Sequence, residues 1–257
     1  MLELKNVSAG YSGNVVVKNA DLTVLPRKIL VLLGENGCGK STLLKTACGI
    51  LPKMSGEILL NGKPLESYSA KKAAQRIAFL PQSRPVPDMT ARSMVLHGRF
   101  PHLGYPRRYK AEDYDIVDEA LRAVDAADIA DKLLTKMSGG ERQKVYLAMA
   151  LAQQTDVILM DEPTTYLDLR HQLETMQLLR KFADSGKAIA LILHDIPLAL
   201  QTADEIAVIS DGEIKMTAPP DEVFQSGILQ SAMGITLRQA ATVEGVRYFC
   251  ALEQKGD

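Results

Sequence analysis

The sequence predicts an α/β fold with a mostly parallel β-sheet, an N-terminal antiparallel β patch and a helical insert. Three observations lead to this prediction. In the second half of the chain, short apolar runs alternate with helical segments, which is typical of parallel strands covered on both faces. A glycine-rich turn at residues 34–42 joins an apolar run to a helix start. A change of composition after residue 82 begins a long stretch with helical patterns.

The 257 residues are enough to bury a core as one large domain. We therefore predict a single domain over residues 1–257, with a helical subdomain at approximately residues 83–155. The 30 basic and 31 acidic residues give a net charge of −1, which argues against a general nucleic-acid binder. The three cysteines form no C-x-x-C pair, so neither a disulfide framework nor a zinc site is expected.

Two features of the sequence indicate where in the cell the protein is expected. No apolar run approaches the ~20 residues that a membrane span requires. The first ten residues carry acidic and basic side chains and have no signal-peptide core. We expect a soluble protein of the cytosol.

The first half of the chain favours strands. The first thirty residues alternate between apolar and polar side chains, which predicts an antiparallel β patch broken by a turn at residues 9–13. The next elements expected are a buried strand at residues 28–33, a helix from Ser41, a strand at 55–62 that ends in an Asn-Gly turn, a helix at 69–75 capped by Ser69, and a strand at 76–80.

The second half begins with the helical insert and then resumes the alternation. The insert is expected to hold a linker at residues 83–88, helices at 90–98 and 111–124, an irregular aromatic and basic stretch at 99–108, and a helix from Ser138 to residue 152. Strands then follow at residues 157–160, 188–193 and 205–209, with helices at 169–183 and from Pro197. After residue 220 the weak signals indicate two short helices and a last strand pair, to which we assign no chemistry.

The turn GENGCGKST fits the phosphate-loop pattern G-x-x-x-x-G-K-[ST] between a strand and a helix. Its glycines allow positive φ angles that turn N–H groups inward, and the helix start adds a partial positive charge. A ligand-free turn would not need Lys-Ser-Thr at its helix start. The motif therefore predicts a P-loop NTPase core, in which nucleotide binding falls to Gly34, Asn36, Gly37, Cys38, Gly39, Lys40, Ser41 and Thr42.

Two adjacent carboxylates follow the apolar run at residues 157–160. Because ligands bind at the carboxyl edge of parallel strands, Asp161 is expected to hold Mg²⁺ together with the Ser41 hydroxyl. Glu162 comes next and is placed to polarise a water molecule for attack on the γ-phosphate. Solvated acids at a strand end are the alternative, and the phosphate loop weighs against it.

Three further residues are singled out beside these motifs. His194 follows a strand and is a candidate donor to the γ-phosphate, although a lone histidine at a strand end is more often structural. Gln82 ends a strand at the start of the insert and could contact metal or water. Tyr11 lies on the first turn, where its ring could stack on a base or simply cover the sheet edge.

The segment Ser138-Gly-Gly-Glu141 fits a capping box before an apolar run. The capping box explains Ser138 and Glu141, but two glycines in the first helical turn lower helix stability. They are understandable if something must approach the backbone closely. A second phosphate-contacting helix start, formed by Ser138, Gly139 and Gly140, would be such a case.

The order of these motifs resembles that of ATP-binding-cassette (ABC) ATPases. Residues 34–42, Gln82, 138–141, 160–162, 167–168 and His194 resemble that family's Walker A, Q-loop, signature, Walker B, D-loop and switch histidine. The resemblance spans nearly the whole chain. It implies the ABC ATPase architecture, with ATP and Mg²⁺ as ligands, and with Ser41, Gln82 and Asp161 toward the metal.

The resemblance also implies a head-to-tail dimer. Ser138 and Gly139 of one copy would then face ATP bound to the phosphate loop of the other, and Tyr11 would stack on adenine. The catalytic residues implied are Glu162, His194 and Gln82. One departure is Glu141, where the family more often has glutamine, and which places a negative charge near a phosphate.

A narrower likeness lies at residues 97–102 (HGRFPH) and 162–171. Both are similar to cassette subunits of bacterial importers for iron–siderophore, haem and vitamin B12 complexes. The expected protein is an ATPase that lies on the inner face of the cell membrane. Its expected partners are permease subunits and, indirectly, a substrate-binding protein. No nucleic-acid partner is expected. Residues 99–108 are a candidate contact surface. The alternatives are a cassette ATPase without a membrane partner, as in iron–sulfur assembly, and a regulatory protein that binds ATP without turnover.

Overall fold

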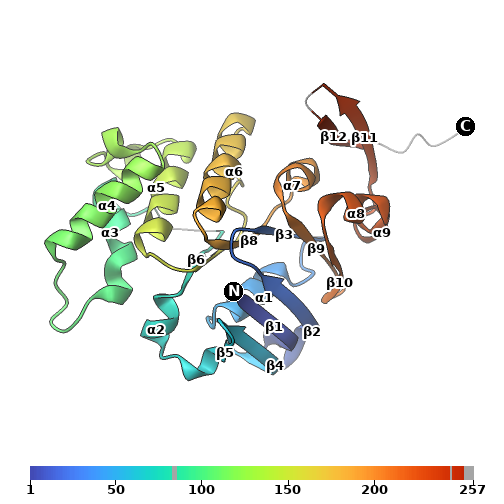
Figure 1. Ribbon diagram of the computed structural model, residues 1–257, viewed down its shortest axis with the longest axis horizontal. Helices are drawn as coiled ribbons and strands as arrows, with labels where there is room; N and C mark the ends of the chain where they lie inside the picture. The colour runs from blue at the N-terminus through green and yellow to red at the C-terminus, as the bar shows by residue number, and fades with distance from the viewer. Residues whose placement is uncertain (83–85, 244, 252–257) are drawn as a thin grey trace, which may run out of the picture.

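A computed structural model describes residues 1–82, 86–243 and 245–251 as an α/β protein (Figure 1). Its main sheet, among the described residues, has the order β10-β9-β3-β8-β7-β6. The strands are β3 (Ile29–Leu33), β6 (Ile77–Leu80), β7 (Val157–Met160), β8 (Ala188–Ile192), β9 (Glu205–Ser210) and β10 (Glu213–Ala218). Five of them are parallel, and β10 pairs with β9 in the antiparallel sense. The predicted mostly parallel sheet is confirmed.

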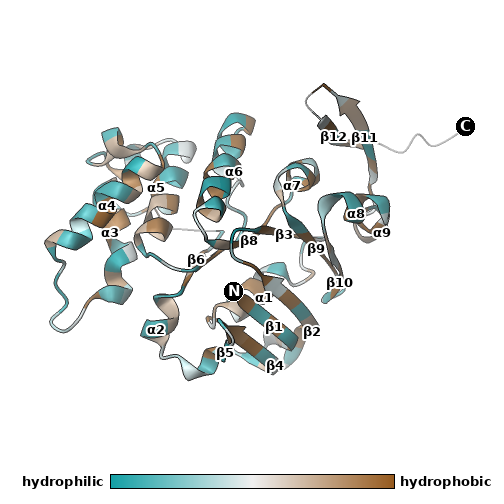
Figure 2. Cartoon of the chain, viewed as in Figure 1, coloured by the Kyte–Doolittle hydropathy of each residue, from teal (hydrophilic) through white to brown (hydrophobic). Residues whose placement is uncertain are grey.

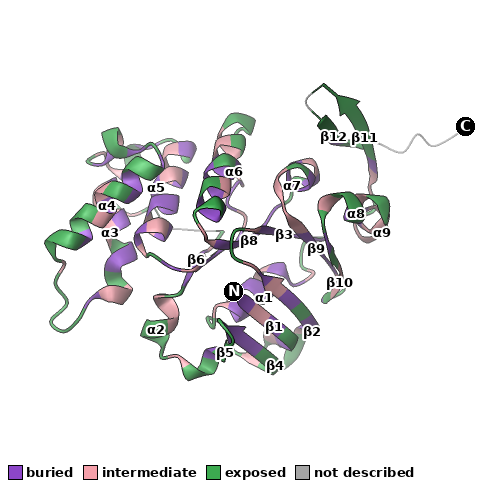
Figure 3. Ribbon diagram, viewed as in Figure 1, coloured by how far each residue is buried: buried purple, intermediate pink, exposed green. Residues whose placement is uncertain are grey.

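The central strands are apolar because both of their faces are covered. All residues of β3, β7 and β8 are buried, and Figures 2 and 3 show these strands as hydrophobic and enclosed. Successive side chains of β3 point to opposite faces of the sheet. Leu30 and Leu32 therefore join one core, whereas Val31 and Leu33 join the other.

The first of these cores lies under the predicted antiparallel β patch, which is confirmed. The patch has the order β2-β1-β4-β5 and consists of β1 (Leu2–Tyr11), β2 (Asn14–Val24), β4 (Lys53–Leu60) and β5 (Lys63–Pro64). Ser12 and Gly13 turn the chain between β1 and β2, and Asn61 and Gly62 make the expected Asn-Gly turn with positive φ angles. Helix α1 (Lys40–Ala47) packs in the same core through Leu43.

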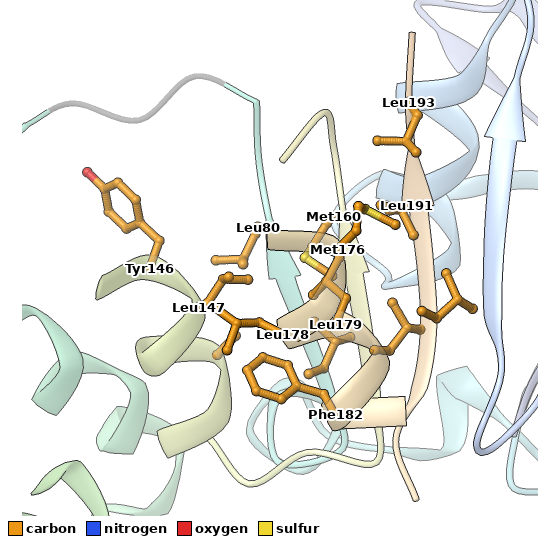
Figure 4. Packing of buried hydrophobic residues seen from close by; sticks show 14 of the residues in the cluster. Leu80, Tyr146, Leu147, Met160, Met176, Leu178, Leu179, Phe182, Leu191 and Leu193 are labelled. Carbon is orange, nitrogen blue, oxygen red and sulfur yellow. The ribbon is translucent and has the colours of Figure 1, made fainter. Parts of the chain in front are cut away.

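The second core lies on the opposite face of the main sheet. There α5 (Gly139–Ala152), α6 (Leu169–Asp184) and α7 (Ile196–Thr202) contribute apolar side chains. Figure 4 shows side chains of α5 and α6, such as Leu147 and Phe182, close to Leu80, Met160 and Leu191 of three neighbouring strands. The helices therefore stand directly behind the strand ends that carry the polar residues.

Helices occupy the chain between β6 and β7 and lie together at one end of the molecule (Figure 1). They are α3 (Ala91–Leu96), the 3₁₀ helix η2 (His97–His102), α4 (Ala111–Ala123), the 3₁₀ turns η3 (Ala127–Ile129) and η4 (Leu134–Lys136), and α5. Part of the linker expected at 83–88, residues 83–85, lies outside the described residues. The expected helices at 90–98 and 111–124 are present within one or two residues.

The stretch at residues 99–108 differs from the expectation in one important respect. Its first part is the 3₁₀ helix η2, and Arg99 is 5 % exposed rather than part of a contact surface. The Arg99 guanidinium donates to Asp113 at 2.9 Å and to the Ala152 carbonyl and Gln154 at 2.8 Å each. A buried charge needs such partners, so Arg99 ties η2 to α4 and α5. Phe100 and Tyr105 remain exposed.

The remaining elements flank the main sheet. They are η1 (Leu65–Ser67), α2 (Ala70–Ala74) with the predicted Ser69 cap, α8 (Pro220–Gln225), α9 (Ile228–Met233), β11 (Thr236–Thr242) and β12 (Gly245–Ala251). Strand β10 was not predicted, because this edge strand alternates and has no apolar run. The Asp211-Gly212 pair before it, with φ angles of 54° and 79°, is the hairpin signal that could have located it.

The C-terminal hairpin is held to α8 by an aromatic contact. The Phe224 and Tyr248 rings are 5.1 Å apart, and the Tyr248 hydroxyl donates to Asp221. Burial, together with this hydrogen bond, raises the pKa of Tyr248 to about 12. None of the helices in the described part of the chain has the length and apolar character to cross a bilayer.

Candidate functional site

The glycine-rich loop lies between β3 and α1, at the carboxyl edge of the main sheet. Gly34 has φ 155°, and a Cβ atom there would lie 2.1 Å from the Ile209 carbonyl oxygen. Gly39 has φ 108° and would bring a Cβ atom within 2.8 Å of Val17. Any other residue at either position would be strained, and at Gly34 it would also displace the backbone of β9. The fold therefore requires glycine at both ends of the loop.

Lys40 lies in the centre of this loop. Its side-chain ammonium donates hydrogen bonds of 2.7 Å to the carbonyl oxygens of Gly34 and Glu35, and the residue is 5 % exposed. The loop backbone therefore wraps around a buried positive charge. Because an ammonium carries three donors, Lys40 can also bind an anion placed above the loop. The Cys38 sulfur lies 3.9 Å from the same ammonium.

Ser41 and Asp161 meet at the sheet edge from two different elements. The Ser41 hydroxyl donates to Asp161 Oδ1 at 3.0 Å, and Asp161 follows β7 and is 3 % exposed. Burial raises the pKa of Asp161, so a cation beside this carboxylate would be stabilising. Hydroxyl and carboxylate oxygens are ligands that Mg²⁺ accepts, with phosphates and water completing its shell. The residues present therefore fit a nucleotide-bound Mg²⁺.

Glu162 is held by side chains from two other segments and from its own turn. Its Oε1 lies 2.6 Å from His194 Nε2, and its Oε2 accepts a bond of 2.9 Å from the Thr165 hydroxyl. The Gln82 amide donates to the same Oε2. Glu162 has a φ of 53°, which is uncommon outside glycine and turns the chain sharply after the strand.

Three residues singled out in the sequence, Gln82, Glu162 and His194, are thus brought together by the fold. His194 contacts the carboxylate in this structure, and its expected contact with a γ-phosphate stays a prediction. Thr165 was missed. Thr165 lies three residues after Glu162 in the turn that follows the strand, and this spacing could have indicated that its hydroxyl contacts the carboxylate.

Ser138 is the N-cap of α5, and the predicted capping box is confirmed. Its side chain accepts from the Glu141 backbone at 3.2 Å, and Glu141 Oε2 accepts from the Ser138 backbone at 2.7 Å. The Glu141 carboxylate also binds the Lys132 ammonium at 2.7 Å. These bonds lower the pKa of Glu141. The negative charge at this position is therefore paired within the chain.

The two helix starts expected to hold one nucleotide are separate within a single chain. No hydrogen bond or ion pair among the described residues joins residues 138–140 to the loop at residues 34–42. Gly139 instead lines a hollow of about 210 Å³ that also includes Gln82 and Glu162. Tyr11 ends β1 and is 46 % exposed, which leaves its ring free to stack.

Comparisons with known proteins give a consistent result. The family model described as ABC transporter matches residues 17–165. The iron(3+)-hydroxamate import ATP-binding protein FhuC of Bacillus subtilis is 38% identical over 91% of this chain and 88% of its own length. The ferric enterobactin transport ATP-binding protein FepC of Escherichia coli is 33% identical over 90% of this chain and 86% of its own.

Solved structures agree in fold. An inward-facing structure described as a metal-chelate type ABC transporter has a TM-score of 0.85 and 26% identity, covering 98% of both chains. The dimeric structure of MJ0796, a bacterial ABC transporter cassette, has a TM-score of 0.74 and 26% identity, covering 86% of this chain and 99% of its own.

Proposed function

The chain belongs to the ABC transporter family, and from this membership we propose that it hydrolyses ATP to power the import of a metal chelate. The chain is an ATPase of this family, and the proposal adds the cargo class, the partners and the residue roles. The observation that carries the residue roles is the convergence of Lys40, Ser41, Asp161 and Glu162 at one edge of the main sheet.

In the proposed reaction, the loop amides and the Lys40 ammonium bind the phosphates of ATP. Ser41 and Asp161 hold Mg²⁺, which supplies positive charge to the phosphate oxygens when bound. Glu162 accepts the proton of the attacking water, and His194 and Gln82 orient the reacting groups. The half-exposed Tyr11 ring stacks on the adenine base.

A second copy of the chain completes the site in this proposal. Residues 138–140 of one copy close over the ATP bound to the loop of the other, since a single chain keeps them apart. The surface beside this helix start is apolar: Tyr166 is 96 % exposed, and Leu169 and Leu173 are also exposed. Burying these side chains between two copies would add to the stability of the closed pair.

We propose that the helices between β6 and β7 form the subdomain that contacts the membrane permease. Beside them lies a hollow of about 450 Å³ lined by residues such as Lys71, Phe100, Leu103 and Tyr105. The Arg107 guanidinium lies 4.5 Å from the centre of the Phe100 ring. This exposed aromatic and basic surface suits a segment of a partner protein. The chain would then lie in the cytoplasm, peripherally on the inner face of the membrane.

The cargo class rests on the relatives, which are named for iron(3+)-hydroxamate and ferric enterobactin. Uptake of a radiolabelled ferric siderophore should be lost in a deletion strain and restored by this chain but not by its Lys40→Ala variant. Unchanged uptake in the deletion strain would count against the cargo. The alternative, an ATPase without a membrane partner, predicts phosphate release but no co-purification with the permease from detergent-solubilised membranes.

A further inference from the structure

The second glycine of the signature, Gly140, is enclosed by a side chain of the same protein. A Cβ atom at Gly140 would lie 2.1 Å from Cδ2 and 2.5 Å from Nε2 of His171, on α6. At Gly139 a Cβ atom would meet nothing closer than Leu167, at 3.7 Å. The fold therefore dictates glycine at only the second of these two adjacent positions.

The imidazole of His171 cannot turn aside freely. Its Nδ1 lies 2.7 Å from Asp168 Oδ1, and its backbone N–H donates to the same oxygen at 2.9 Å. Asp168 is the N-cap of α6, so the ring is fixed to the first turn of that helix. A side chain added at Gly140 would have to break the contact with Asp168 or move the start of α5.

A second contact joins the same two helices one turn further along. Lys144 Nζ of α5 lies 3.6 Å from Glu174 of α6, and Arg170 donates to Glu174 at 2.9 Å. Exposed ion pairs of this kind contribute little to stability. The close packing of His171 on Gly140 therefore limits how closely the two helix starts can approach.

We propose that His171 is a positioning residue, which fixes the start of the signature helix to the turn that carries Tyr166, Leu167 and Asp168. Both segments face the second copy of the chain in the proposed dimer, and this inference rests on that proposed function. Through His171 the two segments keep one relative position and meet the partner as a single surface. The chemistry at Glu162 depends on this alignment.

A double-mutant cycle tests the inference on the purified full chain. Gly140→Ala should lower the kcat of ATP hydrolysis by about 10²-fold, as expected for a displaced reacting group. In a His171→Ala background the same substitution should cost less than about threefold, because the ring that it strikes is gone. His171→Asn, which keeps a donor for Asp168, should retain most of the activity. Binding of ATP to the isolated monomer should stay unchanged in all four variants, including His171→Ala alone.

Gly139→Ala is the matched control, and its effect should be the same with and without His171. The thermal unfolding midpoint of each variant measures the contact without depending on turnover. The changes in midpoint caused by the Gly140 and His171 substitutions should be non-additive in the same way. Equal losses from Gly140→Ala in both backgrounds would overturn the proposal, because the glycine would then serve the nucleotide alone. Absence of ATP turnover in the unmodified chain would refute the proposed function instead, and coupled midpoints would still establish the contact.

Discussion

The imidazole Nε2 of His194 lies 2.6 Å from the Glu162 carboxylate, at the end of a strand two positions along the main sheet from the strand that Gln82 follows. A carboxylate at this distance is well placed to hold an imidazole or to exchange a proton with it. The pair thus joins β7 to β8 at the sheet edge where the phosphate loop lies.

Glu162→Gln should retain ATP binding and lower the rate of phosphate release by roughly 10²–10⁴-fold, because the amide cannot accept a proton from water. The Gln82 and Thr165 bonds can survive, since glutamine has the same shape and keeps one acceptor oxygen. Phosphate release and binding of a fluorescent ATP analogue measure the two effects. Turnover within a few-fold of the unmodified chain would show that another group is the base.

Lys40→Ala should abolish ATP binding, because it removes the charge at the centre of the loop and frees the two carbonyl oxygens that it binds. The thermal unfolding midpoint should then no longer rise when ATP is added. Lys63→Ala removes an equal charge from the exposed strand β5 and serves as the control. A normal ATP-induced rise in the Lys40 variant would remove the basis for placing phosphate here.

Alkylation of Cys38 should block ATPase activity, and bound ATP should protect. Burial raises the pKa of Cys48 to about 11 and also raises that of Cys250, so both thiols should react more slowly than an ordinary cysteine. Mass spectrometry of labelled peptides, with and without ATP, locates the modification. Cys38→Ser should be insensitive to the reagent, and equal labelling of Cys38 in both conditions would contradict the placement of the nucleotide.

Arg99→Ala should destabilise the protein by about 3–5 kcal/mol, because it leaves Asp113 buried without its partner. Arg107→Ala removes a charge only eight residues away, yet should cost less than about 1 kcal/mol, since its ring contact is at the surface. Urea unfolding measures both. In transport assays Arg107→Ala should be folded but impaired in its contact with the permease. Equal stability of the two variants in urea would contradict the conclusion that Arg99 is a buried, paired charge.

Glu141→Gln should keep the capping box but lose the ion pair with Lys132, at a cost of roughly 0.2–1 kcal/mol. The lowered pKa of Glu141 means that its contribution to stability is complete above the ordinary range of a glutamate and is lost as pH falls through the lowered pKa. The variant should therefore lose less stability than the unmodified chain on acidification. Identical pH profiles of the unfolding midpoint would show that the ion pair contributes nothing.

The sequence predicted those parts of the fold that depend on local patterns. The loop at residues 34–42, the buried central strands and the capping box at Ser138 each follow from residue types at fixed spacings, and the structure has them. Gln82 and Glu162 were each predicted to follow a strand, and the structure adds that their side chains meet at the same edge of the sheet.

Contacts between distant segments could not be predicted in this way. The sequence shows Arg99 as one basic residue in a basic stretch, and only the packing of η2 against α4 and α5 reveals that it is buried. The contact between His171 and Gly140 likewise depends on how two helices cross. The sequence places the negative charge of Glu141 near an expected phosphate. The structure shows that Lys132, nine residues earlier, forms an ion pair with this carboxylate.

The contacts of the Glu162 carboxylate have a consequence for ATP hydrolysis by a single protomer. In the single chain, Gln82 and Thr165 donate to one oxygen of this carboxylate and the His194 imidazole lies against the other, so in the proposed reaction a water molecule would have to share these oxygens with them. Under the proposed role of Glu162, a single protomer should therefore hydrolyse ATP slowly.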